Sequence, residues 1–429
     1  MHRRLFLGGL GASLLLTGCH GATATELQVL GLAGAIPGRS LRAFEQKFSK
    51  ITYKTEANPD SLWKRLQNPE NPAQVLSLGD SWLDMAIQRQ LIRPFTPAEL
   101  AQIPNWQKLN RWQEVATRGE QVWGIPYRWG FTGIIYRRDR LNNPIASWAD
   151  LWRPELARKI ILPDDPAEVI GLVLKKLGAS YQHGDPLALP DLADQLQALH
   201  RQVLCYSSTD YIQPLLIDDA DVAVGWSVDL LRAMRQYPLL QVALPTEGTA
   251  LWADVWVIPK TAQFYPLALA WINSTLDPQF AVEITALTDA RSTIDSELIP
   301  ASVKSDRWKF PDPQVIANSE LISRLPAPVR QAQQSIWAKL RRGQVILEEN
   351  KGRQTMEIIG VIKRLNIGMG VWVLETAQGT TYEIMQPVDA KLLKAGQKVK
   401  IKGRERTDLM SVNMVGTMLE VISFSLLGN

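Results

Sequence analysis

The chain has 429 residues, 46% of them hydrophobic, with a formal net charge of +4 and two cysteines. Two of the positive charges belong to Arg3 and Arg4 at the start, so the rest of the chain is close to neutral and has no basic block of the kind that binding to a phosphate backbone requires. Nucleic acid is therefore an excluded partner class, and the length allows two or three domains.

Residues 1–19 have the pattern of an export signal: a charged start, a short apolar run and small residues before a cut site. The run ends in LTGC at residues 16–19, which resembles the bacterial lipobox and predicts a lipid on the sulfur of Cys19. An ordinary cleaved signal is the alternative, and Arg3-Arg4 leaves the general secretory and twin-arginine routes both open. Lipidation would leave Cys205 without a disulfide partner.

The region from Leu27 to about Gly343 alternates short apolar runs with amphipathic stretches, which is typical of an α/β protein. Residues 27–31 are expected to form the first strand. Ser147 and Asp150 form a predicted capping box at the start of a short helix. Val169 to Leu177 carries the buried stripe of a longer helix that Gly178 ends. The body is thus expected to be sheets flanked by helices.

The final part of the chain changes character after a polar linker at residues 346–355. Residues 356–429 contain five β-like segments, at about 357–362, 370–375, 380–385, 398–402 and 418–424, separated by turn signals. They predict a small all-β barrel of the OB or SH3-like type. Trp372 and Tyr382 fit a barrel core as well as a binding platform, so a structural or protein-docking role is favoured.

Acids and indoles stand together at three predicted element boundaries, a combination that suits a cation. Asp165 and Glu168 open the helix after residue 165, where they also fit an ordinary helix cap. Trp226 follows a predicted strand and precedes a predicted helix. This position suits a residue of a ligand-binding cleft, but a tryptophan packed in the core is the alternative. Trp252 and Asp254 alternate with Trp256 on one face of a strand, and an acid between indoles is a poor design for a dry core.

These residues belong to a series of motifs that carries a family likeness. The series is WGFTGIIYRRD at 129–139, SWADLW at 147–152, DD at 164–165, VGWS at 224–227, PTEG at 245–248 and IPK at 258–260. In this order and spacing it resembles the bacterial extracellular solute-binding proteins of the spermidine/putrescine type. The likeness covers residues 27 to 340 and leaves the barrel out.

The resemblance implies a two-lobed periplasmic-binding-protein fold of type II. Lobe 1 would comprise residues 26–134 and 254–305, and lobe 2 residues 135–253 and 306–345. It also implies a polyamine or related small cation in the interlobe cleft, delivery to the membrane permease of an ABC importer, and an exported, periplasmic, lipid-anchored and monomeric protein without a cofactor. The family's ligand-binding positions fall on Asp165, Glu168, Trp226, Trp252 and Asp254.

The chain departs from the family at two places. Leu32 to Ile36 replaces the aromatic residues that polyamine binders carry after the first strand, and a later pocket tyrosine falls at Ala290 beside Arg291. An arginine there would repel a cation or pair with one of the acids. Trp82 is either a replacement for the missing aromatic residues or a residue of the helix core.

Two other functions compete with capture of a cation. A hydrolase would use Asp165, Glu168 and Asp254 as catalytic carboxylates, but the histidines have no metal or triad spacing, so an enzyme is not expected. The second is a lipid-anchored scaffold or sensor whose barrel docks a partner protein while its transport-derived cleft is idle.

Overall fold

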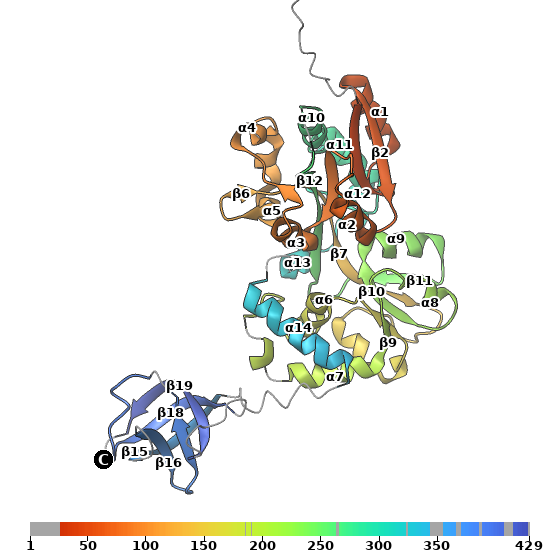
Figure 1. Ribbon diagram of the computed structural model, residues 1–429. Coiled ribbons are helices and arrows are strands. Elements are labelled where there is room, and N and C mark those ends of the chain that lie inside the picture. Colours follow the sequence, from red (N-terminus) through yellow and green to blue (C-terminus); the bar gives the residue numbers. More distant parts are fainter. Residues whose placement is uncertain are drawn as a thin grey trace, which may run out of the picture.

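The computed structural model describes residues 26–184, 186–189, 191–262, 266–322, 325–343, 355–365, 370–385, 388–406 and 415–427. Cys19, the signal segment and nearly all of the predicted linker lie outside these ranges. Within them, no helix has the length and apolarity needed to cross a membrane. The two-lobed α/β fold and the terminal barrel expected from the sequence are both confirmed (Figure 1).

One sheet of 12 described strands runs through both lobes, with the path β2-β1-β3-β12-β7-β10-β8-β9. Its lobe 1 strands are β1 (Glu26–Leu32), β2 (Lys50–Glu56), β3 (Val75–Gly79), β4 (Ile92–Arg93), β12 (Ala250–Pro259) and β13 (Arg291–Ser292). Its lobe 2 strands are β8 (Ile160–Leu162), β9 (Val203–Tyr206), β10 (Val222–Trp226) and β11 (Leu240–Ala243). β14 (Glu320–Leu321) pairs with β12, while β5 (Thr117–Arg118) and β6 (Gln121–Val122) form a separate ribbon.

The long strand β7 (Ile125–Arg137) connects the lobes, and all of its residues are buried. Its first half pairs with β12 and β13, and its second half with β10 and β11. The hydrophobic clusters change at the same point: Phe131 packs into the core of lobe 1, while Ile134 and Ile135 pack into two clusters of lobe 2. β7 therefore carries its side chains from one core to the other between Phe131 and Ile134.

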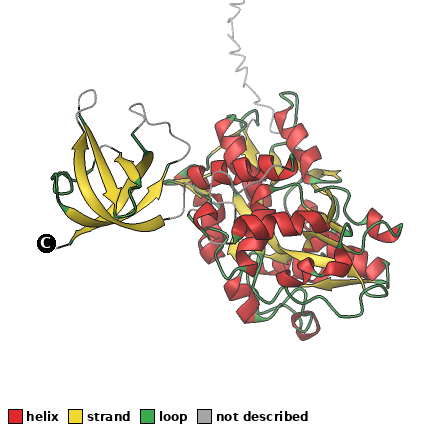
Figure 2. Cartoon of the chain, turned by 90° about the horizontal axis from the view of Figure 1, so that it is seen from below, coloured by secondary structure: helices red, strands yellow, loops and turns green. Residues whose placement is uncertain are grey.

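Helices pack around the strands of the sheet (Figure 2). In lobe 1 they are α1 (Gly38–Lys47), α2 (Pro59–Gln67), α3 (Leu83–Gln88), α4 (Pro97–Leu100), α5 (Gln113–Ala116), α10 (Pro266–Thr275) and α11 (Pro278–Leu287). In lobe 2 they are α6 (Pro166–Lys176), α7 (Leu192–Gln202), α8 (Gln213–Leu216), α9 (Ser227–Gln236) and α14 (Ala327–Arg341). Between them lie α12 (Ala301–Lys304) and α13 (Pro313–Asn318), and 3-10 turns occupy Asp80–Trp82, Pro104–Trp112, Trp148–Trp152, Pro154–Leu156 and Pro186–Ala188.

The predicted starts and end of two helical segments are present in the structure. Ser147 and Asp150 form a complete capping box, although the segment they start is a 3-10 turn. α6 begins after the cap Asp165 with proline at its first position. Gly178 takes a φ of +75° just after that helix ends, a conformation that an L side chain rarely adopts.

The C-terminal part closes into its own barrel in the order β15-β16-β17-β19-β18. The strands are β15 (Thr355–Leu365), β16 (Val371–Thr376), β17 (Thr381–Ile384), β18 (Lys398–Glu405) and β19 (Thr417–Leu426). A separate apolar cluster fills it, with Ile362, Leu374 and Ile401 fully buried. Trp372 and Tyr382 are half-buried against this cluster. The barrel therefore has a core of its own.

Candidate functional site

One face of three neighbouring strands collects the predicted indoles and acids of β10 and β12. Trp226 of β10 pairs with Thr132 of β7, and Trp252 of β12 pairs with Gly130. Asp254 of β12 pairs with Arg128. Alternate residues of β7 point to the same side, and directly opposed residues share a face. We call this surface the crossover face; it carries Arg128, Gly130, Thr132, Trp226, Trp252 and Asp254.

Trp252 lies directly against the backbone of β7. A Cβ added to Gly130 would fall 2.2 Å from Cζ2 of the indole and 2.4 Å from Oγ of Ser227, so only glycine fits beneath the ring. The backbone N–H of Phe131 donates to that same Ser227 Oγ at 3.2 Å. The Trp252 indole is half-buried, and its N–H has no acceptor among the described residues.

α6 places its first residues over the Thr132 end of the crossover face. Asp165 caps the helix by accepting from the backbone N–H groups of Ala167, at 2.8 Å, and Glu168, at 3.2 Å. Glu168 is only 5% exposed, and Oγ1 of Thr132 donates to its Oε1 at 2.9 Å. The other carboxylate oxygen, Oε2, has no partner among the described residues.

The surroundings of Glu168 disfavour its ionised form. Burial raises the pKa of Glu168 to about 8, and the carboxylates of Asp165 and Asp80 act in the same direction against the Thr132 hydrogen bond. Burial also raises the pKa of Asp165, in spite of its two backbone hydrogen bonds. A cation placed among these carboxylates would favour their ionised forms.

Asp80 brings a carboxylate from the opposite lobe. It follows β3 directly, where Gly79 pairs with Asp254, and is 5% exposed. Because Asp80 raises the pKa of Glu168, the two groups interact electrostatically between lobe 1 and lobe 2. Asp80 is not among the residues that the sequence predicted to bind a ligand. The available signal was its position at the carboxyl end of a buried strand, where ligands bind in open sheets.

At the other end of the crossover face, Asp254 already has a cationic partner. Nε and one terminal nitrogen of Arg128 both contact Oδ2 of Asp254 at 2.6 Å. The two residues are 4% and 5% exposed. Burial acts to lower the pKa of Arg128, but Asp254 outweighs it and the pKa is raised, so the guanidinium remains charged. No local pattern relates these residues, which are 126 positions apart.

Trp256, expected on the same strand face as Trp252 and Asp254, is a core residue. It is fully buried, stacks on Tyr127 at 4.2 Å and donates from Nε1 to Oγ1 of Thr275 at 3.1 Å. The register between β12 and β7 shifts just after Asp254, at an irregularity of the ladder. The three alternating side chains of β12 are therefore divided. Trp252 and Asp254 lie on the crossover face, whereas Trp256 lies in the core of lobe 1.

Trp226 stands at the end of β10 beside Tyr211. The two rings meet edge to face at 6.1 Å, and the Tyr211 hydroxyl donates to Asp229 at 2.7 Å. A Cβ on Gly225 would lie 2.2 Å from the Tyr211 ring, so this glycine serves the packing of Tyr211. Trp226 itself is half-buried.

Other side chains lie near the two departures from the family. After β1, a Cβ on Gly34 would lie 3.7 Å from a guanidinium nitrogen of Arg232 in α9 of lobe 2. Arg291 lies over the rings of Trp129, at 5.5 Å, and Phe310, at 4.2 Å, and pairs with Asp295. It pairs there with neither Asp254 nor Glu168. Trp82 stacks on Trp63 at 4.9 Å and packs on the lobe 1 core.

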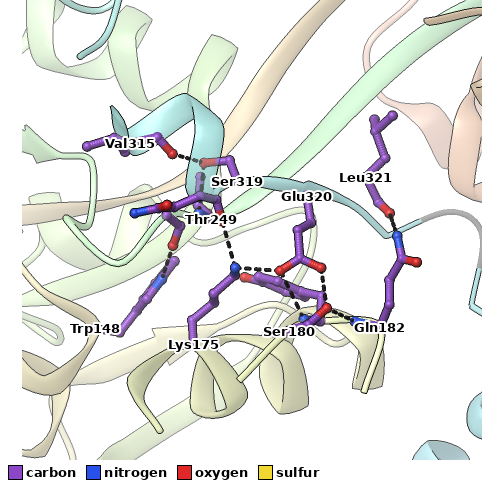
Figure 3. Close-up of polar contacts among 12 residues, drawn as sticks. Trp148, Lys175, Ser180, Gln182, Thr249, Val315, Ser319, Glu320 and Leu321 are labelled. Atoms are coloured by element: carbon purple, nitrogen blue, oxygen red, sulfur yellow. Dashed lines mark hydrogen bonds and ion pairs between the residues drawn. The ribbon is translucent and has the colours of Figure 1, made fainter. Parts of the chain in front are cut away.

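The far end of α6 is fastened to the strand that accompanies β12 (Figure 3). Lys175 Nζ lies 2.5 Å from Oε1 of Glu320 and donates to the backbone oxygen of Asn318 at 2.6 Å. Glu320 pairs with Ala250 at the start of β12. Gln182 donates to the Leu321 carbonyl in the same network at 3.2 Å. This contact fixes α6, which carries Glu168, relative to the strand that carries Trp252.

A hollow of about 400 Å³ lies beside this network. Its lining comes from both lobes: Arg111, Glu114, Gln182, Leu251, Ser319, Glu320 and Leu321. Leu251 points away from the crossover face because it alternates with Trp252 along β12. A much smaller hollow, of about 10 Å³ on the same measure, lies at Gly130 and Ser227 and extends to Arg291 and Trp308.

The sequence of residues 70–308 matches the family of bacterial extracellular solute-binding proteins. This chain belongs to that family. The spermidine/putrescine-binding periplasmic protein of Salmonella typhimurium is 26% identical over 325 residues, covering 74% of this chain and 92% of its own. The putrescine/cadaverine-binding protein of Pseudomonas aeruginosa is 24% identical and covers 76% and 97%. The resemblance drawn from the motifs is confirmed, and the family consists of solute-binding transport proteins rather than enzymes.

Solved structures agree on the fold. The spermidine/putrescine transporter substrate-binding protein of Streptococcus pneumoniae superposes with a TM-score of 0.63 at 22% identity, covering 74% of this chain and 99% of its own. A ferric iron-binding protein of Mannheimia haemolytica superposes at 0.52 with 14% identity, covering 74% and 99%. Solute-binding proteins that share this fold thus take different ligands, and the ligand must be argued from the crossover face.

Proposed function

We propose that this protein is the substrate-binding lipoprotein of an ABC importer, exported and anchored through Cys19, that captures a polyamine or related small cation between its lobes. The names of the relatives support the ligand class and the periplasmic location. The LTGC motif at residues 16–19 supports the anchor. Delivery to a membrane permease follows from the transport role of the family.

The observation that carries the proposal is the carboxylate oxygen of Glu168 that has no partner among the described residues and lies beside two further acids. A buried carboxylate is expensive unless a positive charge or hydrogen-bond donors satisfy it. An ammonium group supplies both, because its three N–H bonds can be shared among several carboxylate oxygens. The residues assigned to ligand binding are Asp165, Glu168, Trp226, Trp252 and Asp254.

The indoles give the same site an apolar wall. Trp252 lies against Gly130, and Trp226, which is half-buried, lies one strand away on the other side of β7. Ring faces attract ammonium groups by about 0.5 to 2 kcal/mol, and they offer an apolar surface to the methylenes next to them. An amine with a short carbon chain therefore fits both the acids and the rings.

A thermal-shift screen of residues 20–429 tests this function against amines, neutral sugars and carboxylic acids. The proposal expects amines alone to raise the melting temperature, because only they bind the folded acids. Replacing Trp252 by Ala should reduce that shift, whereas Trp337→Ala removes an indole that packs on Tyr206 of lobe 2 and serves as the matched control. A shift with an acid or a sugar but with no amine would overturn the ligand class.

A further inference from the structure

The crossover face has a charge-balanced end and an acidic end. Arg128 and Asp254 form a buried ion pair at one end, and Glu168 receives its hydrogen bond from Thr132 at the other. Thr132 and Arg128 are four residues apart on β7, which corresponds to roughly 13 Å along a strand. Trp252 lies between them, opposite Gly130.

At the Arg128 end, the protein supplies its own cation. The guanidinium approaches Asp254 to 2.6 Å through two nitrogens, and both side chains are at least nine-tenths buried. An ammonium group brought to Asp254 would have to displace this guanidinium or lie beside it, with like charges in contact. Neither arrangement is favourable in a buried place.

At the Glu168 end, carboxylates from the two lobes lie near one another. Glu168, Asp165 and Asp80 interact there, and Oε2 of Glu168 has no partner among the described residues although the side chain is 5% exposed. Asp80 belongs to lobe 1 and the other two acids to lobe 2. A positive group at this place would hold the two lobes together through both sets of carboxylates.

We infer that the ligand is a monocation: its single ammonium group lies between Asp80 and Glu168, its carbon chain runs along Trp252, and Arg128 takes the place of a second ammonium at Asp254. This inference rests on the proposed function and narrows its ligand class. The distal end of the ligand is uncharged, because it faces the Arg128–Asp254 pair, which is neutral as a unit. Linear di- and triamines of similar length are then the poorer ligands.

The test compares two compounds that differ in one group. Putrescine carries an ammonium at each end of a four-carbon chain, whereas 4-amino-1-butanol carries a hydroxyl at one end. Calorimetric titration of residues 20–429 should give 4-amino-1-butanol an affinity equal to or higher than that of putrescine. Tenfold tighter binding of putrescine, about one strong interaction, would overturn the inference and leave the proposed function standing. Binding of neither compound would overturn both.

Variants of Arg128 and Asp254 test whether their ion pair causes the preference for 4-amino-1-butanol over putrescine. Arg128→Met releases Asp254 and should shift the preference toward putrescine by about tenfold or more. The double variant Arg128→Met with Asp254→Asn removes both charges and should not show this shift. Arg93→Met is the control, because it breaks an arginine–carboxylate pair with Glu99 of lobe 1 away from the crossover face. An unchanged preference in folded Arg128→Met would contradict the role of Arg128, and if that variant does not fold, the wild-type comparison still decides.

Discussion

The Thr132 hydroxyl donates to Glu168 at 2.9 Å and links the strand that joins the lobes to the helix that presents the acids. It satisfies one carboxylate oxygen of Glu168, and the other, Oε2, has no hydrogen-bond partner among the described residues. This contact places a buried acid beside the point where the chain passes from one core to the next. Its consequences can be measured.

The stability of the free protein should depend on pH through Glu168. The carboxyl ionises with a pKa near 4.5 in the unfolded chain and about 8 in the folded protein. Between these values the unfolded state binds fewer protons, so the free energy of unfolding falls as pH rises, and the contribution is fully present only below about pH 4.5. Glu168→Gln should therefore be more stable than wild type at about pH 9, by an amount on the order of a few kcal/mol, and similar at about pH 5. Denaturant unfolding at both pH values checks this; a constant difference would contradict it.

Amine affinity should rise with pH over the same interval. Below about pH 8 a proton on Glu168 must leave before the carboxylate can pair with an ammonium, with Asp165 and Asp80 favouring its retention. The affinity should increase by up to about tenfold per pH unit between about pH 6 and pH 8. Calorimetry in buffers of different ionisation enthalpy would detect the released proton. A flat profile would mean that Glu168 is ionised before the ligand arrives.

Gly130→Ala should damage the site by displacing an indole. The new Cβ would meet the Trp252 ring at 2.2 Å and Ser227 Oγ at 2.4 Å, so the ring must move away from β7. We expect an amine affinity lower by about tenfold and a loss of stability of about 1 to 3 kcal/mol. Gly184→Ala is the matched control, since nothing lies within 4 Å of its added Cβ. Equal amine affinities of the two variants would mean that Trp252 does not contact the ligand.

Lys175→Met should destabilise lobe 2 because it leaves Glu320 without its partner in a largely buried place. Breaking such a pair costs about 3 kcal/mol. Arg65→Met breaks the exposed pair with Glu56 and should cost at most about 1 kcal/mol. Chemical unfolding of the two variants gives the comparison. A similar cost for both would mean that the network around α6 does not hold the helix in place.

Lipid anchoring depends on one residue. Cys19→Ser removes the sulfur that would carry the lipid, so the protein should move from the membrane fraction to the soluble periplasmic fraction. Fractionation of expressing cells with an antibody against the barrel measures the distribution. Unchanged membrane association of the variant would rule out Cys19 as the anchor.

The sequence predicted the fold well because its signals are local or follow a family pattern. The cap Asp165, the end of α6 near Gly178 and the five barrel strands depend on short-range turn, capping and alternation rules. The motif order then assigned these elements to a two-lobed fold. That assignment needed no knowledge of side-chain contacts.

The site was less predictable because its charges meet through tertiary contacts. Arg128 and Asp254 lie on separate strands, and no local sequence pattern near either residue predicts their ion pair. The sequence instead drew attention to Arg291, which packs between Trp129 and Phe310. Alternation along β12 also could not show that Trp256 stacks within the lobe 1 core on Tyr127.

Calorimetric titration of residues 20–429 with 4-amino-1-butanol and putrescine, in wild type and in Glu168→Gln, tests the central claim most directly. Capture of a small cation by the crossover face predicts saturable binding of at least one of the two amines to wild type and a loss of about tenfold or more in the variant. Amine binding that survives the substitution, or no amine binding by the folded wild-type protein, would contradict it.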